Sequence, residues 1–218
     1  MLKFLGLPML AIVAFSANPA KAHPHLYAKM TSAIVTSADG KITAIGVQWN
    51  FDETYTQFAI EGLDANGNGV YEDAELKPLT DENIANLKES NYFVSVLQSG
   101  KPVAAGAVTD YGQSLESDRL TLYFILPLQT PVDAKLAPVD VKIYDPDFFI
   151  AFDYVLKNPV NLDGALPAGC AMDLKPLPTT EETDQAREFL STKGTEWKPE
   201  QPQDFGSMFA QSLVVSCS

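Results

Sequence analysis

The chain has 218 residues, 46% of them apolar, and its 15 basic and 28 acidic side chains give a formal net charge of −13. This composition predicts one globular domain with a sizeable core, and the acidic balance argues against nucleic-acid binding. With two histidines and two cysteines, sites that need three imidazoles or a thiolate cluster are excluded, so the remaining metal ligands of the chain are mostly oxygen atoms.

Residues 1–22 predict a secretory signal peptide. Lys3 precedes an apolar run over residues 4–15, and the segment ends in the small-residue pattern Ala20-Lys21-Ala22. The apolar run is shorter than the ~20 residues of a membrane-spanning helix, and no later run is longer. We therefore expect residues 23–218 to form a single periplasmic domain that is not embedded in the membrane.

The next elements predict a mainly β fold with a helical insertion. Residues 26–36 and 42–49 alternate around an Asp39-Gly40 turn, as in a β-hairpin, with Trp49 and Phe51 as core residues. Helical spacing over 53–63 and 80–90 predicts an insertion at about 52–90. Further strands are expected at residues 92–97, 103–108, 119–126, 139–144 and 148–156. Short strands with few helices between them favour an antiparallel β-sandwich.

The C-terminal tail, about residues 158–218, is rich in proline, glycine and acidic residues. It contains one short predicted helix, over 180–190, and an apolar segment over 205–215. In an oxidising compartment Cys170 and Cys217 are expected to form a disulfide, which adds about 4 kcal/mol of stability for a loop of this length. The tail is therefore expected to pack across the sandwich, pinned by this bond.

Residues 64–75 match the EF-hand calcium-loop pattern and lie between the two predicted helices of the insertion. Calcium prefers six to eight oxygen ligands, and Gly69 permits the sharp turn at the sixth position. A single loop with neutral asparagine ligands favours a structural Ca²⁺ site over a sensor. The alternative is a solvated Asn/Gly turn. The expected ligands are the side chains of Asp64, Asn66, Asn68, Glu72 and Glu75 and the carbonyl of Val70.

Signal-peptide cleavage would expose His23-Pro24-His25, which holds both histidines of the chain. Residues two apart in an extended chain face the same side, and the α-amine of His23 adds a third nitrogen. Such donors suit Cu²⁺, Ni²⁺ or Zn²⁺. The alternative is a frayed terminus with incidental histidines. Candidate oxygen ligands for this site are Asp52, Asp110, Asp145 and Asp147, although residues 144–149 are equally explained as two strands joined by a proline turn.

Short segments distributed over nearly all of residues 22–217 carry a family resemblance: Ala22-His23-Pro24-His25, Trp49-Asn50-Phe51-Asp52-Glu53, Gly62-Leu63-Asp64, Thr109-Asp110-Tyr111, Tyr144-Asp145-Pro146 through Phe152, Gly169-Cys170 and Cys217. Together these segments resemble the DUF1007 family of exported bacterial proteins. Members are often labelled as an uncharacterised periplasmic component of an ABC-type transport system, and they are associated with nickel/cobalt-type efflux permeases. The resemblance implies periplasmic metal handling beside an inner-membrane transporter.

These observations favour a non-enzymatic periplasmic metal-binding protein that serves a Ni, Co, Cu or Zn transporter and is braced by calcium. No Gly-x-Ser-x-Gly, His-Glu-x-x-His or Gly-rich phosphate loop is present. Two alternatives stay open. One is a copper-dependent oxidase that uses the N-terminal histidine His23, and the other is a calcium-stabilised structural or interaction module.

Overall fold

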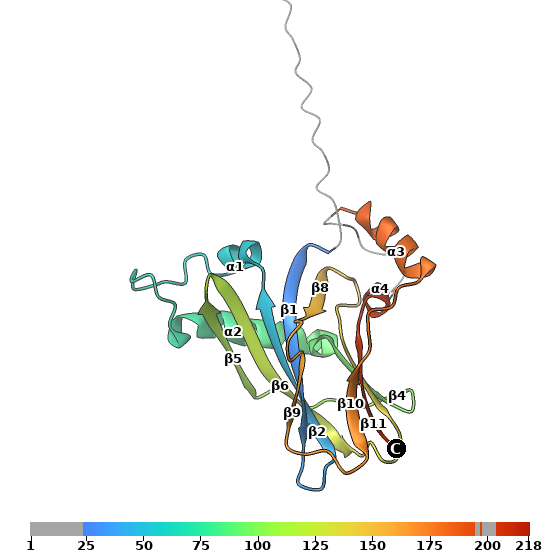
Figure 1. Ribbon diagram of the computed structural model, residues 1–218. Coiled ribbons are helices and arrows are strands. Elements are labelled where there is room, and N and C mark those ends of the chain that lie inside the picture. The colour runs from blue at the N-terminus through green and yellow to red at the C-terminus, as the bar shows by residue number, and fades with distance from the viewer. Residues whose placement is uncertain (1–23, 195–196, 198–203) are drawn as a thin grey trace, which may run out of the picture.

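The chain forms two β-sheets in the computed structural model, which describes residues 24–194, 197 and 204–218 (Figure 1). The larger sheet has the strand order β5-β6-β2-β1-β8, and β9 pairs with β1 farther along that strand. The other pairings are antiparallel, but β8 and β9 run parallel to β1. Its strands are β1 (Leu26–Thr36), β2 (Ile42–Phe51), β5 (Asp110–Glu116), β6 (Arg119–Val132), β8 (Ile150–Tyr154) and β9 (Val160–Asp163).

The smaller sheet has the order β10-β11-β7-β3-β4 and is antiparallel throughout. The disulfide between Cys170 and Cys217 joins β10 to β11, where these two residues face each other in register. The predicted bond is therefore confirmed, and it fastens the last strand, β11, to β10 within the tail. The strands are β3 (Val94–Gln98), β4 (Lys101–Pro102), β7 (Val139–Ile143), β10 (Cys170–Leu174) and β11 (Ser212–Cys217).

The helices lie in two groups. The first follows β2 and contains α1 (Glu53–Ala59), α2 (Asp73–Leu87) and the 3₁₀ segment η1 (Lys88–Phe93), with α2 packed beside β5. The second belongs to the tail and contains α3 (Glu181–Ser191) and α4 (Phe205–Met208). In Figure 1 these two helices lie near the start of β8, away from β9. Among the described residues, no helix has the length and apolar character needed to cross a membrane.

A single apolar core joins the two sheets. Alternating residues of β7 are fully buried, as expected for a strand with one face in the core. Trp49 is 1% exposed, and its ring lies 5.2 Å from Phe124 and 4.6 Å from Phe152. Phe51 is also buried, so the prediction that both aromatic residues of β2 belong to the core is confirmed.

Several predicted elements are confirmed and others are wrong. The first hairpin and the tail helix are present, as β1–β2 and α3. The second insertion helix begins at Asp73 rather than near residue 80, with Pro78 inside it. No strand covers residues 103–108, because Val103 donates its N–H to Val96 in one sheet and Gly106 donates to Pro127 in the other. This segment crosses between the sheets and therefore forms no continuous ladder.

Candidate functional site

The loop between α1 and α2 is folded around the carboxylate of Asp64. One oxygen accepts the backbone N–H groups of Gly67 (2.8 Å) and Asn68 (3.1 Å), and the other accepts that of Gly69 (2.9 Å). Both glycines have positive φ, 72° and 77°, and a Cβ at either position would meet no atom within 4 Å. Their conformation, and not crowding, therefore requires glycine at these two positions, and it turns the chain so that the amides face Asp64.

The carboxylate of Glu75 also accepts hydrogen bonds from backbone amides of the loop. It accepts N–H groups from Ala65 (2.9 Å), Asn66 (3.4 Å) and Glu72 (3.2 Å). Glu75 lies in the first turn of α2, where a negative charge is favoured by the helix dipole and can cap free amides. The Glu72–Glu75 spacing is the sequence signal for this early helix start, which the apolar periodicity alone did not reveal.

The side chain of Glu72 spans the two asparagines of the loop. Asn68 donates to one of its oxygens at 2.8 Å and Asn66 to the other at 3.2 Å. The contact with Glu75, followed by the hydrogen bond from Asn68, lowers the pKa of Glu72 below its ordinary value. The side-chain oxygen of Asn66 accepts the backbone N–H of Asn68 at 2.9 Å, and that of Asn68 accepts the backbone N–H of Val70 at 2.6 Å. All five predicted side-chain ligands thus belong to one hydrogen-bonded loop.

The donor set of this loop is mostly oxygen and suits a hard cation. Among the described residues, no group of three His, Cys, Asp or Glu side chains forms a metal-binding cluster. A cation here would therefore also need the asparagine oxygens and the Val70 carbonyl. The helix before the loop ends at Ala59, with Gly62 in a left-handed conformation before Asp64. The entering helix is thus shorter than the sequence predicted.

The N-terminal site is described only in part, because His23 lies outside the described residues. The backbone N–H of His25 donates to the carbonyl of Phe149 at 2.8 Å, and the two rings lie 4.9 Å apart. Leu26 then begins β1, which pairs with β8. His25 is therefore held against the loop that precedes β8.

The carboxylates expected to complete that site have different surroundings. Asp145 is 6% exposed and accepts the backbone N–H groups of Asp147, Phe149 and Ile150 at 3.0 Å each, which gives it a structural role. Asp52 caps α1 and also accepts the N–H of Tyr27. Asp110 and Asp147 are exposed. The proline-turn interpretation of residues 144–149 therefore explains Asp145 without a metal.

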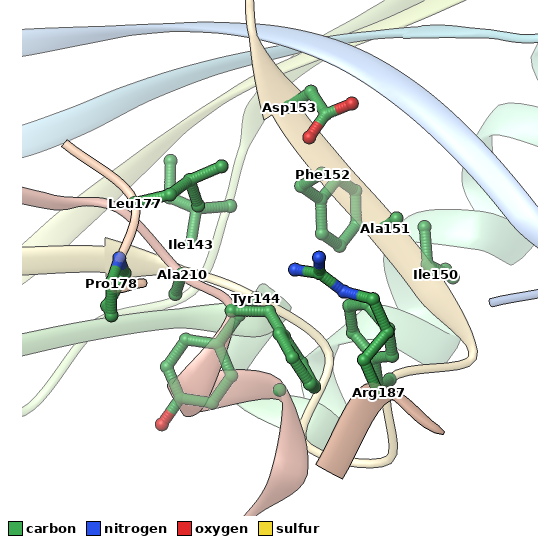
Figure 2. Close-up of a pocket in the computed structure, with 13 residues that line it drawn as sticks. Ile143, Tyr144, Ile150, Ala151, Phe152, Asp153, Leu177, Pro178, Arg187 and Ala210 are labelled. Carbon is green, nitrogen blue, oxygen red and sulfur yellow. The ribbon is translucent and has the colours of Figure 1, made fainter. Parts of the chain in front are cut away.

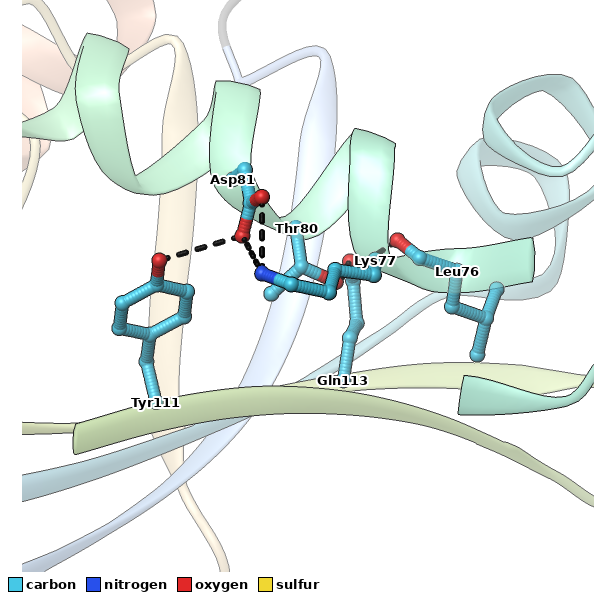
Figure 3. A network of polar contacts seen from close by, with 6 residues as sticks. All are labelled: Leu76, Lys77, Thr80, Asp81, Tyr111 and Gln113. Carbon is cyan, nitrogen blue, oxygen red and sulfur yellow. Dashed lines mark hydrogen bonds and ion pairs between the residues drawn. The ribbon is translucent and has the colours of Figure 1, made fainter. Parts of the chain in front are cut away.

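A polar network connects α2 to β5 (Figure 3). Lys77 pairs with Asp81 at 2.6 Å, and the hydroxyl of Tyr111 donates to the same carboxylate at 3.1 Å. The bond with Lys77 is the largest cause that lowers the pKa of Asp81. In the same network, the buried Thr80 hydroxyl lies 2.9 Å from the side-chain amide oxygen of Gln113 and 2.8 Å from the backbone carbonyl oxygen of Leu76. This network anchors the helix that carries Glu75.

A small cavity of about 80 Å³ lies where the tail covers β8 (Figure 2). Arg187 reaches toward it from α3, and its guanidinium lies 5.4 Å from the ring of Phe209. A water molecule occupies roughly 30 Å³ of liquid, so this space holds a few waters at most. We assign it to the packing of α3 and α4 against the sheet.

Comparison with known proteins places the chain among uncharacterised relatives. It is 25% identical over 198 residues to an uncharacterised protein of Haemophilus influenzae, with 90% of this chain and 91% of that protein covered. It is 34% identical over 99 residues to an uncharacterised 15.5 kDa protein in the trpE 3′ region of Spirochaeta aurantia, with 45% and 70% covered. The family described as "Protein of unknown function (DUF1007)" matches residues 8–217. The chain therefore belongs to the DUF1007 family.

Proposed function

We propose that this protein is an exported, periplasmic metal-binding protein in which residues 64–75 hold a structural Ca²⁺ ion. The supporting observation is that the carboxylates of Asp64 and Glu75 are each oriented by three backbone N–H groups of the loop. A carboxylate has about four lone-pair sites, so each keeps room for a cation after three N–H bonds. In this proposal the two sheets form a sandwich and α1, the loop and α2 act as an EF-hand-like brace.

Calcium titration with a matched pair of variants tests this proposal. We expect the protein to bind Ca²⁺ with a Kd on the order of 10⁻⁴ M, as in extracellular modules. Glu75→Gln should weaken binding by more than about tenfold, or 1.4 kcal/mol. Glu61→Gln makes the same charge change at an exposed position before the loop and should bind Ca²⁺ normally. Equal affinities in the two variants, measured by calorimetry, would reject the site.

Bound calcium should also raise stability. A ligand at about 100 times its Kd stabilises the folded state by roughly 2.7 kcal/mol if it does not bind the unfolded chain. Urea unfolding with and without Ca²⁺ measures this gain, and Mg²⁺, which dehydrates reluctantly and needs octahedral geometry, is the control ion. An equal gain with Mg²⁺ would contradict a calcium-selective loop.

We further propose that His23 and His25 capture a transition-metal ion for an inner-membrane transporter. The bond from His25 to Phe149 supports this, because a tethered residue is a better ligand than a frayed one. The test compares a chain that begins at His23 with one that carries a single extra residue before it. Because the extra residue removes the α-amine of His23 from the chelate, Cu²⁺, Ni²⁺ and Zn²⁺ should bind the first more tightly. Equal affinity would reject the amine as a ligand.

A further inference from the structure

An apolar cavity of about 390 Å³ lies between the larger sheet and the helical insertion. Trp49, Phe51 and Leu122 line it from β2 and β6, whereas Tyr55 and Leu87 line it from α1 and α2. All three sheet residues are at least nine-tenths buried, so the floor is rigid core. Cavities of roughly 300–1,000 Å³ with such linings are typical of small-molecule sites.

The polar groups around this cavity are few and uncharged. Asn83 and Asn86 of α2 and Ser90 of η1 line it, and none of the described lining residues is Asp, Glu, Lys, Arg or His. A charged ligand would lose its hydration here without gaining a counter-charge, which costs several kcal/mol per ion. The lining therefore selects an uncharged molecule with an apolar body and a hydrogen-bonding end.

Trp49 reports on this cavity. Its indole lines the cavity, and its Nε1–H is buried without a hydrogen-bond partner among the described residues. Because this nitrogen has almost no accessible surface, a ligand in the cavity contacts the indole ring and not its N–H. The hydrogen-bonding groups that line the cavity on α2 are the side-chain amides of Asn83 and Asn86.

We propose that this cavity binds a small uncharged amphiphile, such as a medium-chain alcohol or ketone. At interior packing densities the volume fits on the order of 12 non-hydrogen atoms. The apolar part lies against Trp49, Phe51 and Leu122, and the oxygen bonds to the side-chain amide of Asn83 or Asn86. This inference does not depend on the calcium or transition-metal proposals.

The experiment titrates 1-octanol into a Trp197→Phe variant, in which Trp49 is the single tryptophan, and follows its fluorescence. We expect saturable binding with a Kd on the order of 10⁻⁴ M, given ligand efficiencies for molecules of this size. Octanoate has the same chain with a carboxylate and should bind at least about tenfold more weakly. Equal binding of octanoate would overturn the assignment to uncharged ligands, and absence of saturable octanol binding would overturn the site.

Two variants on α2 locate the site. Asn83→Phe fills the cavity and should lower octanol affinity by about tenfold or more. Ala85→Phe adds the same ring at an exposed position of the same helix and should leave the affinity unchanged. Asn86→Phe, on the exposed rim, replaces Asn83→Phe if near-ultraviolet circular dichroism shows that the latter is misfolded. Unchanged affinity in a folded cavity-filling variant would contradict the proposal.

Discussion

Asp145 illustrates how a residue that suggests metal ligation can instead organise a loop. Its carboxylate is buried and accepts three backbone N–H groups from the turn that follows. The carbonyl of the same residue accepts the N–H of Phe148, and Pro146 accepts that of Gly206 in α4. The side chain therefore fixes the turn that supports both His25 and the tail, which is a structural reason for an acidic residue here.

Replacement of this carboxylate should destabilise the fold. Asp145→Ala leaves three partly buried N–H groups without their acceptor, and we expect a loss of about 3 kcal/mol in the free energy of unfolding. Asp147→Ala, two residues away, removes an exposed carboxylate and should change stability by less than about 0.5 kcal/mol. Urea denaturation of both variants measures the difference. Similar stability losses in the two would contradict the loop-organising role.

The same carboxyl group predicts a pH dependence of stability. Burial is the largest influence on it and raises its pKa, although the three N–H bonds act in the opposite direction. Its unfolded pKa is about 3.9, so the folded chain binds the proton more tightly. The stability that the protonated Asp145 contributes is fully present below its unfolded pKa and is lost as pH rises through its folded pKa.

Unfolding free energies of the wild type and Asp145→Asn, compared from acidic to neutral pH, isolate this effect because other carboxyl groups are common to both. The stability of the wild type relative to Asp145→Asn should fall as pH rises through the folded pKa of Asp145. A relative stability that rises with pH over that range would show that the pKa is lowered instead.

At the scale of elements, α1 depends on the sheet for its stability. A helix of seven residues is too short to be stable alone in water. The hydroxyl of Thr56, which is 1% exposed, accepts the N–H of Leu120 at the start of β6 at 3.0 Å. This bond satisfies a buried amide and fixes α1 beside the larger sheet.

Thr56→Val tests this contact with little change of shape. The variant leaves the Leu120 N–H unsatisfied, and we expect a loss of about 1–3 kcal/mol in the free energy of unfolding. Thr56→Ser keeps the hydroxyl and should be closer to wild type. Thermal unfolding followed by circular dichroism ranks the three proteins, and a serine variant as unstable as the valine variant would show that the methyl group matters more than the bond.

Local patterns in the sequence predicted those elements whose stability is local. The Asp39-Gly40 turn and the alternation on either side of it indicated the first hairpin, and a short tail helix was expected where α3 lies. The parallel pairing of β8 and β9 with β1 joins residues more than 120 positions apart, and no short pattern specifies it. β5, β9 and β10 have few buried residues, so their sequences lack the apolar alternation that identifies a strand.

The candidate calcium ligands were predictable because an EF-hand loop places every ligand within 12 consecutive residues. The cavity was not, because its walls come from β1, β2, β6, β8, α1, α2 and η1, together with Phe149. Trp49 and Phe51 were correctly predicted as core residues, yet the sequence does not show that the insertion leaves a cavity beside their rings. Sites made by long-range packing need the fold before they can be seen.

At the scale of the whole molecule, the proposed calcium loop and the apolar cavity share the helical insertion. The 64–75 loop connects α1 to α2, and Tyr55 on α1 and Leu87 on α2 both line the apolar cavity. A cation in the loop would restrict the positions of α1 and α2 relative to each other. Because both helices line the cavity, the cation would also restrict the shape of the cavity wall. If both sites exist, their binding free energies should be coupled.

Thermodynamic linkage makes this coupling measurable in both directions. We expect saturating Ca²⁺ to raise octanol affinity by roughly fivefold, near the lower end of typical coupling energies, and octanol to raise Ca²⁺ affinity by the same factor. The first is read from Trp49 fluorescence in the Trp197→Phe protein and the second from calorimetry. Glu75→Gln, which removes a proposed calcium ligand, should abolish the effect of Ca²⁺ on octanol, whereas Glu61→Gln should retain it. Octanol affinity that is unchanged by Ca²⁺ would mean that the calcium loop does not affect the shape of the cavity. The hydrogen bonds of Thr56 with Leu120 and of Thr80 with Gln113 would then fix α1 and α2 without the ion.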